Sequence, residues 1–409
     1  MSVTATSISA GIDAAVEQWL PVYKHIHAHP ETAFAEHQTT ALIAEHLRRL
    51  GLHTSTSDQV TGVVASFVNG DGPVIGLRAD IDALPLAEET GLDYASTVGA
   101  PAPAMHACGH DVHIATLLAA VDLLVTHRDS WSGTIVPIFQ PAEEVGSGAQ
   151  RLVESGIFGA HPTPTAIIGQ HTGNAEIGTI RIRAGALHAA ADTWRVTVRG
   201  PGGHAASPHK TIDLIVVAAA IILRLQTIVA REVPPLSPAV VTVSSIHGGS
   251  AGNIIPAEVV FQVNVRTFDP AVQDQISAAI KRIVAAEASA AGLTTPPEVV
   301  RVGGFSPTSN DPDLTAKVRV ALEAEFGVER VIDAELVTGS EDFGDIGTGL
   351  GVPSAFWFYG GGLAATVAGD DPAPNGHSPR FAPDPIGALT TGIRGFLATT
   401  LALLASPEP

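Results

Sequence analysis

Apolar positions along the first part of the chain switch repeatedly between a helical and a strand period. Residues 11–29 and 36–50 repeat apolar side chains at the spacing of one helix face. Residues 62–69 and 74–79 have the pattern of strands, and a Gly-Asp-Gly-Pro turn separates them. Because predicted helices alternate with predicted strands, the pattern indicates an α/β sheet.

The same alternation extends to about residue 187 and returns after residue 303. The further elements that it predicts are helices at 114–125, 312–326 and 385–404 and strands at 135–139, 166–171 and 354–359. We therefore predict one α/β domain made of two parts, residues 1–187 and residues 304–409.

Between these parts, over residues 188–303, the order of predicted elements changes. It becomes strand, helix, strand, strand, helix, strand, at 191–199, 212–231, 239–247, 258–268, 273–291 and 298–302. That β-α-β-β-α-β order is the split βαβ, or ferredoxin-like, unit. We therefore predict a small domain inserted into the larger one.

Composition and charge narrow the class of protein. The 409 residues are 45% hydrophobic, which supports sizeable cores and argues against global disorder. Acidic residues outnumber basic ones by 41 to 22, giving a formal net charge of -19. This charge argues against nucleic acid or an anionic membrane surface as a partner.

No segment is expected to span a membrane or to direct secretion. The longest apolar stretch, residues 212–229, is interrupted by Asp213, Arg224 and Gln226, which predicts a buried amphipathic helix. The first eight residues lack the basic and apolar regions of a signal peptide. The single cysteine excludes an intramolecular disulfide and fits a reducing compartment. We therefore expect a cytoplasmic protein.

A thiol and several imidazoles crowd the stretch Met105-His-Ala-Cys-Gly-His-Asp-Val-His, just before a predicted helix. A lone cysteine is most often a small buried hydrophobe, and isolated histidines are most often surface or core residues. Thiolate and imidazole are nevertheless ligands suited to zinc and similar divalent ions, and Cys108 and His110 can face one point across the glycine. The stretch is therefore a candidate metal site.

A pair of carboxylates follows the strand at 135–139. Adjacent side chains diverge, so Glu144 can bind a metal ion while Glu143 faces the water that the metal carries. The alternative is an exposed acidic loop. Two histidines join the set, because His171 ends an apolar strand and His377 lies in a turn-rich loop.

Two further groups of polar residues remain open to interpretation. Asp80 and Asp82 stand at the carboxyl end of a strand, where they either support a ligand site or form a structural ion pair with Arg78. His25, His27 and His29 precede a proline, which favours a role in shaping a helix end, and we do not assign them as ligands.

Taken in order, the motifs of this chain resemble the aminoacylase/carboxypeptidase group of dinuclear metallo-hydrolases, and most of all its hippurate hydrolase and auxin-conjugate amidohydrolase branch. The resemblance runs from about His27 to Phe381. The motifs that carry it are Arg78-Ala-Asp-Ile-Asp-Ala-Leu-Pro, the Met105 to His113 stretch, Gln140-Pro-Ala-Glu-Glu, Gly200-Pro-Gly-Gly-His-Ala-Ala-Ser-Pro-His, Asn253-Ile-Ile-Pro, Gly339-Ser-Glu-Asp-Phe and His377-Ser-Pro.

The resemblance implies a metal centre and a base. Two divalent ions, zinc, manganese, cobalt or nickel, would be bound by Cys108, His110, Glu144, His171 and His377, with the thiolate as the bridging ligand. Glu143 would be the general base of a mechanism without a covalent intermediate.

The resemblance also assigns roles to the inserted domain. His204 would reach an active site across a homodimer interface and stabilise the oxyanion, and Asn253 and Arg266 would contact the substrate. For Arg266 a plain position on a strand surface is the alternative. Gln170 and Thr172 depart from the branch's usual apolar residues, which predicts a different pocket wall beside His171.

We therefore expect a metal-dependent amidohydrolase that cleaves the amide bond of N-acyl amino acids or related small conjugates. The alternatives are a dipeptidase or carboxypeptidase that uses the same dinuclear site, and a non-catalytic metal-binding protein. Glu143 discriminates against the last of these, because a pure binding site needs no base beside a ligand.

Overall fold

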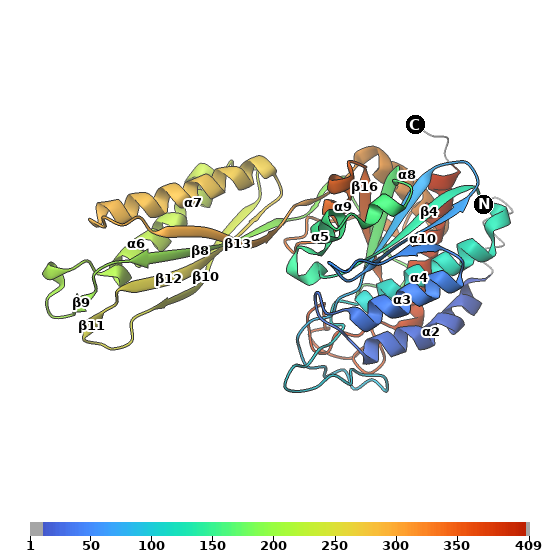
Figure 1. Cartoon of the computed structure of the whole chain (residues 1–409), viewed down its shortest axis with the longest axis horizontal. Helices are drawn as coiled ribbons and strands as arrows, with labels where there is room; N and C mark the ends of the chain where they lie inside the picture. The colour runs from blue at the N-terminus through green and yellow to red at the C-terminus, as the bar shows by residue number, and fades with distance from the viewer. Residues whose placement is uncertain (1–10, 406–409) are drawn as a thin grey trace. The chain divides into compact units, whose positions relative to one another are not determined.

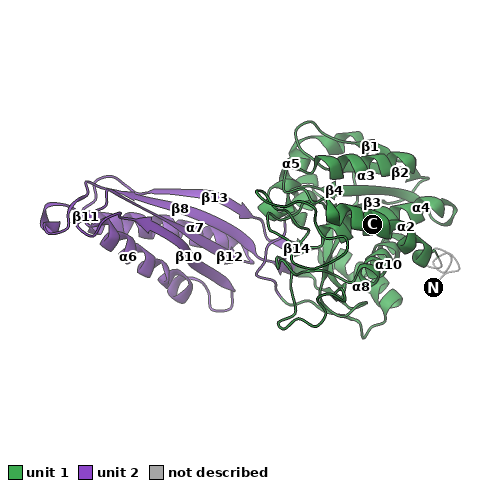
Figure 2. Ribbon diagram, turned by 90° about the horizontal axis from the view of Figure 1, so that it is seen from below, with its two compact units in different colours: residues 1–185, 309–335, 342–409 green, residues 186–308, 336–341 purple. Residues whose placement is uncertain are grey.

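The computed structural model describes residues 11–405, so the residues on which the expected absence of a signal peptide rests lie outside the described range. The chain folds into two compact units (Figure 2). Unit 1 takes the chain up to Gly185, Ser309–Glu335 and the chain from Asp342, and unit 2 takes Ala186–Thr308 and Leu336–Glu341. Leu336–Glu341 belongs to unit 2 because the backbone of Val337 pairs with that of Leu187 and Ala189.

Unit 1 is built on an eight-stranded sheet in the order β1-β2-β4-β3-β5-β16-β6-β15. The strands are β1 (His53–Ser55), β2 (Val63–Asn69), β3 (Val74–Asp80), β4 (Gly133–Gln140), β5 (Ala166–Gly173), β6 (Ile180–Ile182), β15 (Val331–Asp333) and β16 (Ser354–Gly360). The central strands β4, β3, β5 and β16 run parallel. Their carboxyl ends therefore meet at one edge, where open α/β sheets hold their sites.

Helices cover both faces of this sheet (Figure 1). They are α2 (Ile12–Ala28), α3 (His37–Arg49), α4 (His110–Thr126), α5 (Gly148–Glu154), α8 (Pro312–Phe326), α9 (Phe343–Leu350) and α10 (Pro385–Leu404). Side chains alternate along a strand, so neighbours in β5 show which helices lie on which face. Ile168 packs into the core that α2, α4, α8 and α10 share, whereas Gly169 faces Phe343 of α9.

Unit 2 has the predicted β-α-β-β-α-β order. Its elements are β8 (Ala190–Arg199), α6 (Leu214–Leu225), β10 (Ala239–Gly248), β12 (Glu258–Thr267), α7 (Pro270–Ala290) and β13 (Glu298–Phe305). The antiparallel sheet has the order β10-β12-β8-β13, and α6 and α7 share one core with it (Figure 1). The ferredoxin-like architecture is confirmed.

The sequence pattern did not predict the shortest elements. These are β1, β6, β15, α5, α9, the β9 and β11 pair (Gly203–His204 and Ile254–Ile255), β7 (Gly185–His188) and β14 (Thr308–Asn310). A strand of two to four residues is too short to display a period of two, which explains why these strands were not predicted. The helices α5 and α9 have only seven and eight residues, too few for a helical period to repeat clearly.

Two helical segments are long and apolar enough to cross a membrane by length and composition alone, Leu214–Glu232 and Pro385–Leu404. Two thirds of the Pro385–Leu404 window is buried inside the structure, as in a core helix. Only 33% of the Leu214–Glu232 window is buried. Its buried positions in α6, including Val217 and Ile221, follow a helical period, so α6 is amphipathic as predicted, although its outer face is also apolar.

His27 is the one member of the histidine tract in α2 with a defined buried role. Its Nδ1 lies 2.6 Å from Asp111 Oδ2 and its Nε2 lies 3.1 Å from Glu88 Oε1, with all three side chains buried. Burial alone would lower the pKa of His27, but the Asp111 and Glu88 carboxylates raise the pKa to about 9. His27 is therefore a charged link between α2, α4 and the loop that follows β3.

We expect this link to make the free energy of unfolding depend on pH. Because the pKa of His27 rises from 6.5 to about 9 on folding, its contribution of about 3 kcal/mol is complete below pH 6.5 and is lost as the pH rises through 9. When urea unfolding is measured from acid to alkaline pH, the free energy of unfolding of the wild type should fall, and this fall should be absent in His27→Gln. Exposed His25 supplies the control, and an identical pH slope in wild type and His27→Gln would contradict the assignment.

Candidate metal centre

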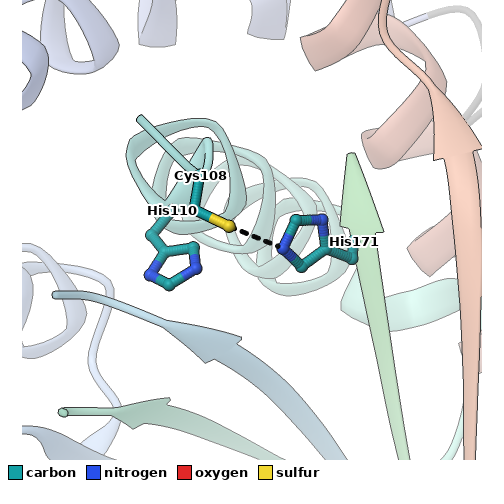
Figure 3. A group of neighbouring side chains, drawn as sticks. All are labelled: Cys108, His110 and His171. Atoms are coloured by element: carbon teal, nitrogen blue, oxygen red, sulfur yellow. Dashed lines mark hydrogen bonds between the residues drawn. The ribbon is translucent and has the colours of Figure 1, made fainter. Parts of the chain in front are cut away.

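The site is assembled where the central strands end and α4 begins. Gly109 is the N-cap of α4 and adopts a left-handed φ of 83°. A Cβ at Gly109 would stand 2.6 Å from Thr172 Cγ2 at the end of β5. Glycine therefore allows this turn to press against β5, which brings Cys108 and His110 beside His171 (Figure 3).

The ligand atoms of Cys108, His110 and His171 all lie within 4.8 Å of one another. Cys108 Sγ is 3.4 Å from His171 Nε2. His171 Nδ1 donates a hydrogen bond to the backbone oxygen of Thr172 at 2.6 Å, which leaves Nε2 with its lone pair directed at the group. Burial and the neighbouring His113 keep the pKa of His171 well below 6.5, so the ring is neutral, as a metal ligand must be.

A second group contains Cys108, Glu144 and His377, again within 4.8 Å of one another. His377 Nε2 lies 3.3 Å from Glu144 Oε2. His377 has a left-handed φ of 67°, and its backbone N–H donates to the Ala107 oxygen, which fixes this loop next to the cysteine turn. Cys108 belongs to both groups, as expected for a thiolate between two ions.

Glu143 lies with His110 and Glu144 in a third group of the same size. The structure thus brings together all five predicted ligands and the predicted base. These residues come from the start of α4, the turn after β4, the end of β5 and the loop before α10.

The unsatisfied atoms of this cluster fit a metal. Nε2 of buried His110 has no hydrogen-bond partner within the described residues, and the same holds for Oε1 of Glu144. Burial, reinforced by the Glu144 carboxylate, raises the pKa of the Cys108 thiol to about 12. A bound cation would satisfy these atoms and stabilise the thiolate, so the donor set suits a divalent metal ion.

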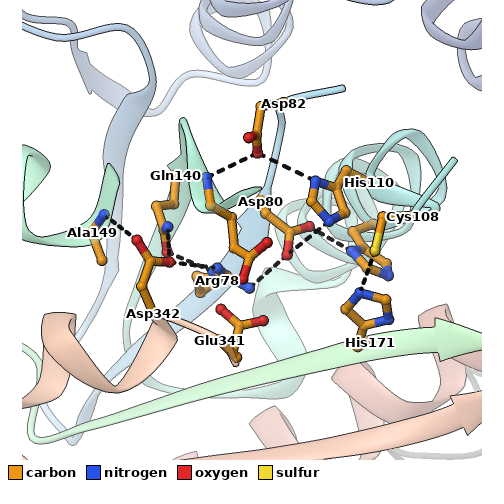
Figure 4. Close-up of polar contacts among 12 residues, drawn as sticks. Arg78, Asp80, Asp82, Cys108, His110, Gln140, Ala149, His171, Glu341 and Asp342 are labelled. Carbon is orange, nitrogen blue, oxygen red and sulfur yellow. Dashed lines mark hydrogen bonds and ion pairs between the residues drawn. The ribbon is translucent and has the colours of Figure 1, made fainter. Parts of the chain in front are cut away.

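Asp82 fixes the turn that carries both glutamates. Its Oδ1 accepts the backbone N–H of Glu143 and its Oδ2 accepts that of Glu144, each at 3.0 Å. Asp82 Oδ1 also lies 3.3 Å from His110 Nδ1 (Figure 4). One buried carboxylate therefore sets the positions of the predicted base and of two predicted ligands, which favours the supporting role over a structural ion pair for Asp82.

Asp80 has both roles that the sequence left open. Its Oδ2 accepts from Arg78 at 2.7 Å, and its Oδ1 accepts from His113 Nδ1 at 2.5 Å. His113 Nε2 in turn accepts the backbone N–H of Thr172 at 2.9 Å. Both nitrogens of His113 are thus occupied, so it positions the end of β5 and is not available as a ligand.

Sequence reasoning missed Glu36. This carboxylate is completely buried, accepts the backbone N–H of Ala142 at 2.9 Å and accepts from the Thr61 hydroxyl at 2.6 Å. Ala142 has a left-handed φ of 52°, which is unfavourable for alanine, and Glu36 holds this residue directly before Glu143. No local pattern around Glu36 indicates this contact.

Asp342 was present in the quoted motif but had no assigned role. It accepts from Gln140 Nε2 at 2.5 Å and from the Ala149 backbone at 3.0 Å (Figure 4). It therefore clamps the end of β4 to the start of α5, on either side of the two glutamates.

The predicted oxyanion donor and the two predicted substrate-contacting residues lie in unit 2, where the structure groups two of the three. His204 ends β9 and Asn253 directly precedes β11, since Ala205 N–H donates to the Asn253 oxygen and His204 pairs with Ile254. Arg266 is near the other end of β12, about 25 Å along the strand from the Glu258 end, and it donates to Asn264 and Ser340. These side chains do not form one site within unit 2.

The predicted effect of Gln170 on a pocket wall is not supported. Gln170 is buried and donates to the Gly392 oxygen of α10, so its side chain faces the helix-packed core. Thr172, the other departure, is also buried and lies next to the site, against Gly109.

Comparison with known proteins finds relatives over most of the chain. The model of peptidase family M20/M25/M40 matches residues 76–400. N-acetyl-L-cysteine deacetylase of Bacillus subtilis (strain 168) is 40% identical over 346 residues, covering 84% of this chain and 80% of that protein. IAA-amino acid hydrolase ILR1-like 2 of Arabidopsis thaliana is 36% identical and covers 80% and 74%, and thermostable carboxypeptidase 1 of Saccharolobus solfataricus is 35% identical and covers 80% and 82%.

Solved structures agree over nearly the whole chain. A putative aminohydrolase from methicillin resistant Staphylococcus aureus has a TM-score of 0.86 at 28% identity, covering 97% of this chain and 99% of that one. A Bacillus subtilis protein described as a dinuclear metal binding peptidase from the M20 family has a TM-score of 0.79 at 30% identity, covering 96% and 99%. The predicted resemblance and fold class are confirmed.

Proposed function

We propose that this chain, which belongs to peptidase family M20/M25/M40, is a metal-dependent amidohydrolase that releases a carboxylic acid and an amino acid from N-acyl amino acids or related small conjugates. The observation that carries the proposal is the pair Glu143 and Glu144 at the end of β4, with one carboxylate beside His377 and both beside His110. Relatives named as a deacetylase and as an IAA-amino acid hydrolase support this reaction class.

The metal ligands would be Cys108, His110, Glu144, His171 and His377, holding two divalent ions. When bound, such ions polarise an amide carbonyl and acidify a water molecule. Thiolate, imidazole and carboxylate together suit zinc, manganese, cobalt or nickel better than magnesium or calcium.

Glu143 is the group that moves the proton. Its carboxylate takes a proton from the attacking water as the new C–O bond forms, and it returns that proton to the amide nitrogen as the C–N bond breaks. Asp82 holds the Glu143 backbone during both transfers. The products are a free carboxylic acid and a free amine, without a covalent enzyme intermediate.

Unit 2 would supply the oxyanion donor and the dimer interface. His204 and Asn253 lie at the end of the unit 2 sheet remote from Ala190, where the chain enters β8. The motif resemblance implies that such groups reach an active site across a homodimer interface, so a second copy would be their source. The outer face of α6 and the edge strand β10 expose Val216, Leu223 and Ile246. Apolar side chains and an unpaired strand edge suit association with the same face of another copy.

A dipeptidase or carboxypeptidase remains the second candidate, because the chemistry at the metal centre would be identical. The thermostable carboxypeptidase relative favours it specifically. Arg266, a half-buried guanidinium, would suit the free carboxylate of either kind of substrate.

The deciding experiment is amino-acid release from a panel of N-acyl amino acids and dipeptides, before and after chelation and re-addition of zinc, manganese, cobalt or nickel. We expect release that chelator abolishes and one of these ions restores, with N-acyl amino acids preferred. Preferred cleavage of dipeptides would select the second candidate. No release with any ion would reject both, and would favour a metal-binding protein without catalysis.

A further inference from the structure

A cavity of about 560 Å³ lies in unit 1, and none of the predicted metal ligands lines it. It is bounded by α3, by the loop from Thr56 to Thr61 and by α5. Its lining carries two arginines from different elements, Arg48 of α3 and Arg151 of α5, together with His37. The proposed reaction uses none of these side chains.

The cationic groups of this cavity are not neutralised within the described residues. Neither Arg48 nor Arg151 forms an ion pair there, whereas Arg49, the neighbour of Arg48, pairs with Glu45. Asp58 is the only carboxylate in the lining. In a chain with a net charge of -19, a cavity lined by two exposed arginines that form no ion pair within the described residues, and by one carboxylate, is a candidate site for an anion.

Arg151 is also held in place. Its guanidinium carbon lies 4.5 Å from the centre of the Phe34 ring, a cation–π arrangement that leaves the N–H edge available. Phe34 has a left-handed φ of 61°, so the loop that supports Arg151 is itself in an uncommon conformation. A guanidinium ordered in this way loses less entropy when it binds an anion.

The wall of the cavity is connected to the glutamate turn by hydrogen bonds. Thr61, a lining residue, donates to Glu36 Oε2 at 2.6 Å, and Glu36 Oε1 accepts the Ala142 N–H at 2.9 Å. Arg151 lies on α5, the helix that follows the same turn. The cavity is therefore connected to the backbone around Glu143 in two ways, by the hydrogen bonds of Glu36 and by the chain that continues into α5.

We propose that this cavity binds a small dianion, either a dicarboxylate or a tetrahedral oxyanion, between Arg48 and Arg151, and that its occupancy stabilises the turn at Ala142. The ligand would be recognised by two guanidinium groups and the hydroxyls of the lining. The site shares no residue with the predicted metal ligands, and it would act on the turn through Thr61 and Glu36.

Binding is tested by calorimetric titration of the metal-loaded protein with sodium sulfate and, separately, sodium succinate, at constant ionic strength. The double variant Arg48→Gln, Arg151→Gln should bind at least about tenfold more weakly, since each charge-assisted hydrogen bond carries a large share of such affinity. Arg128→Gln, which changes an exposed arginine outside the cavity, should bind as wild type does. Preference between the two salts identifies the ligand class.

Absence of binding by both salts, or equal binding by wild type and the double variant, would overturn the proposal; the latter would place the anion on the metal ions. A second readout is hydrogen exchange in the peptide that contains Ala142 and Glu143. Exchange should slow when the preferred salt is added to wild type and not when it is added to the double variant, and unchanged exchange in wild type would overturn the link to the turn. Neither readout needs turnover, so failure of the proposed hydrolase activity would be recognised separately.

Discussion

Glu143→Gln is expected to lose turnover by about 10²–10⁴-fold while retaining its bound metal, because the amide cannot accept the proton of the attacking water. The substitution preserves the shape of the side chain, and the backbone N–H of Glu143 still donates to Asp82. We expect the kcat to fall with little change in KM. Single-turnover hydrolysis and metal analysis of the same preparation measure the two effects separately.

Glu144→Gln is the matched control, since it makes the same change from carboxylate to amide at the adjacent residue. This variant should lose metal, because Glu144 lies 3.3 Å from His377 and its Oε1 has no hydrogen-bond partner within the described residues. Excess metal ion should restore part of its activity but none of that of Glu143→Gln. Near-normal turnover by Glu143→Gln would remove it as the base.

The second large effect is expected at His204. His204→Ala should lower the kcat by about 10²–10³-fold with metal content intact, if the imidazole stabilises the oxyanion. His204 is exposed, and its imidazole accepts a hydrogen bond from the backbone N–H of Ala206. The substitution should therefore remove little folding stability.

Mixed dimers show whether His204 acts on its own subunit or across an interface. When His204→Ala and Glu143→Gln chains are dissociated together and reassociated, about half of the dimers are mixed, and one of the two sites in each contains both intact residues if His204 acts in trans. Activity should then recover to about a quarter of the wild-type value, as two-fold symmetry requires. No recovery in dimers that have demonstrably exchanged would place His204 in its own subunit's site.

The parts of this site that the sequence revealed are those that depend on short separations. Cys108 and His110 flank one glycine, so both can face one point. Glu143 and Glu144 are adjacent, so their side chains diverge, and both relations follow from local geometry. Helices of twelve or more residues and the longer strands were predicted within a few residues, because their periods repeat several times.

The contacts that escaped prediction join distant positions. Glu36 and Ala142 are separated by 106 residues, and Gln140 and Asp342 by 202. Nothing in the residues around Glu36 distinguishes it from a surface glutamate on an acidic chain. Only the folded structure shows that Glu36 is buried and accepts a hydrogen bond from the backbone N–H of Ala142.

Similarly, Gln170 was expected to change the pocket wall because it departs from the branch's usual apolar residue beside His171. Alternation along β5 places the two side chains on opposite faces, and Gln170 contacts α10 instead. Substitutions next to a ligand in sequence are therefore poor guides to substrate preference when the ligand lies on a strand.

Because Asp82 accepts two backbone N–H groups, it makes the positions of the two adjacent glutamates different. Since one carboxylate fixes both amide groups of the turn, the first glutamate and the second cannot exchange positions by rotating the backbone. A residue inserted after Ala142 would leave the dipeptide readable in the sequence but would move the first glutamate to the position of Glu144 and the second beyond the two amides that Asp82 holds. The motif would still be found by a sequence search, although neither glutamate would keep its position relative to Asp82.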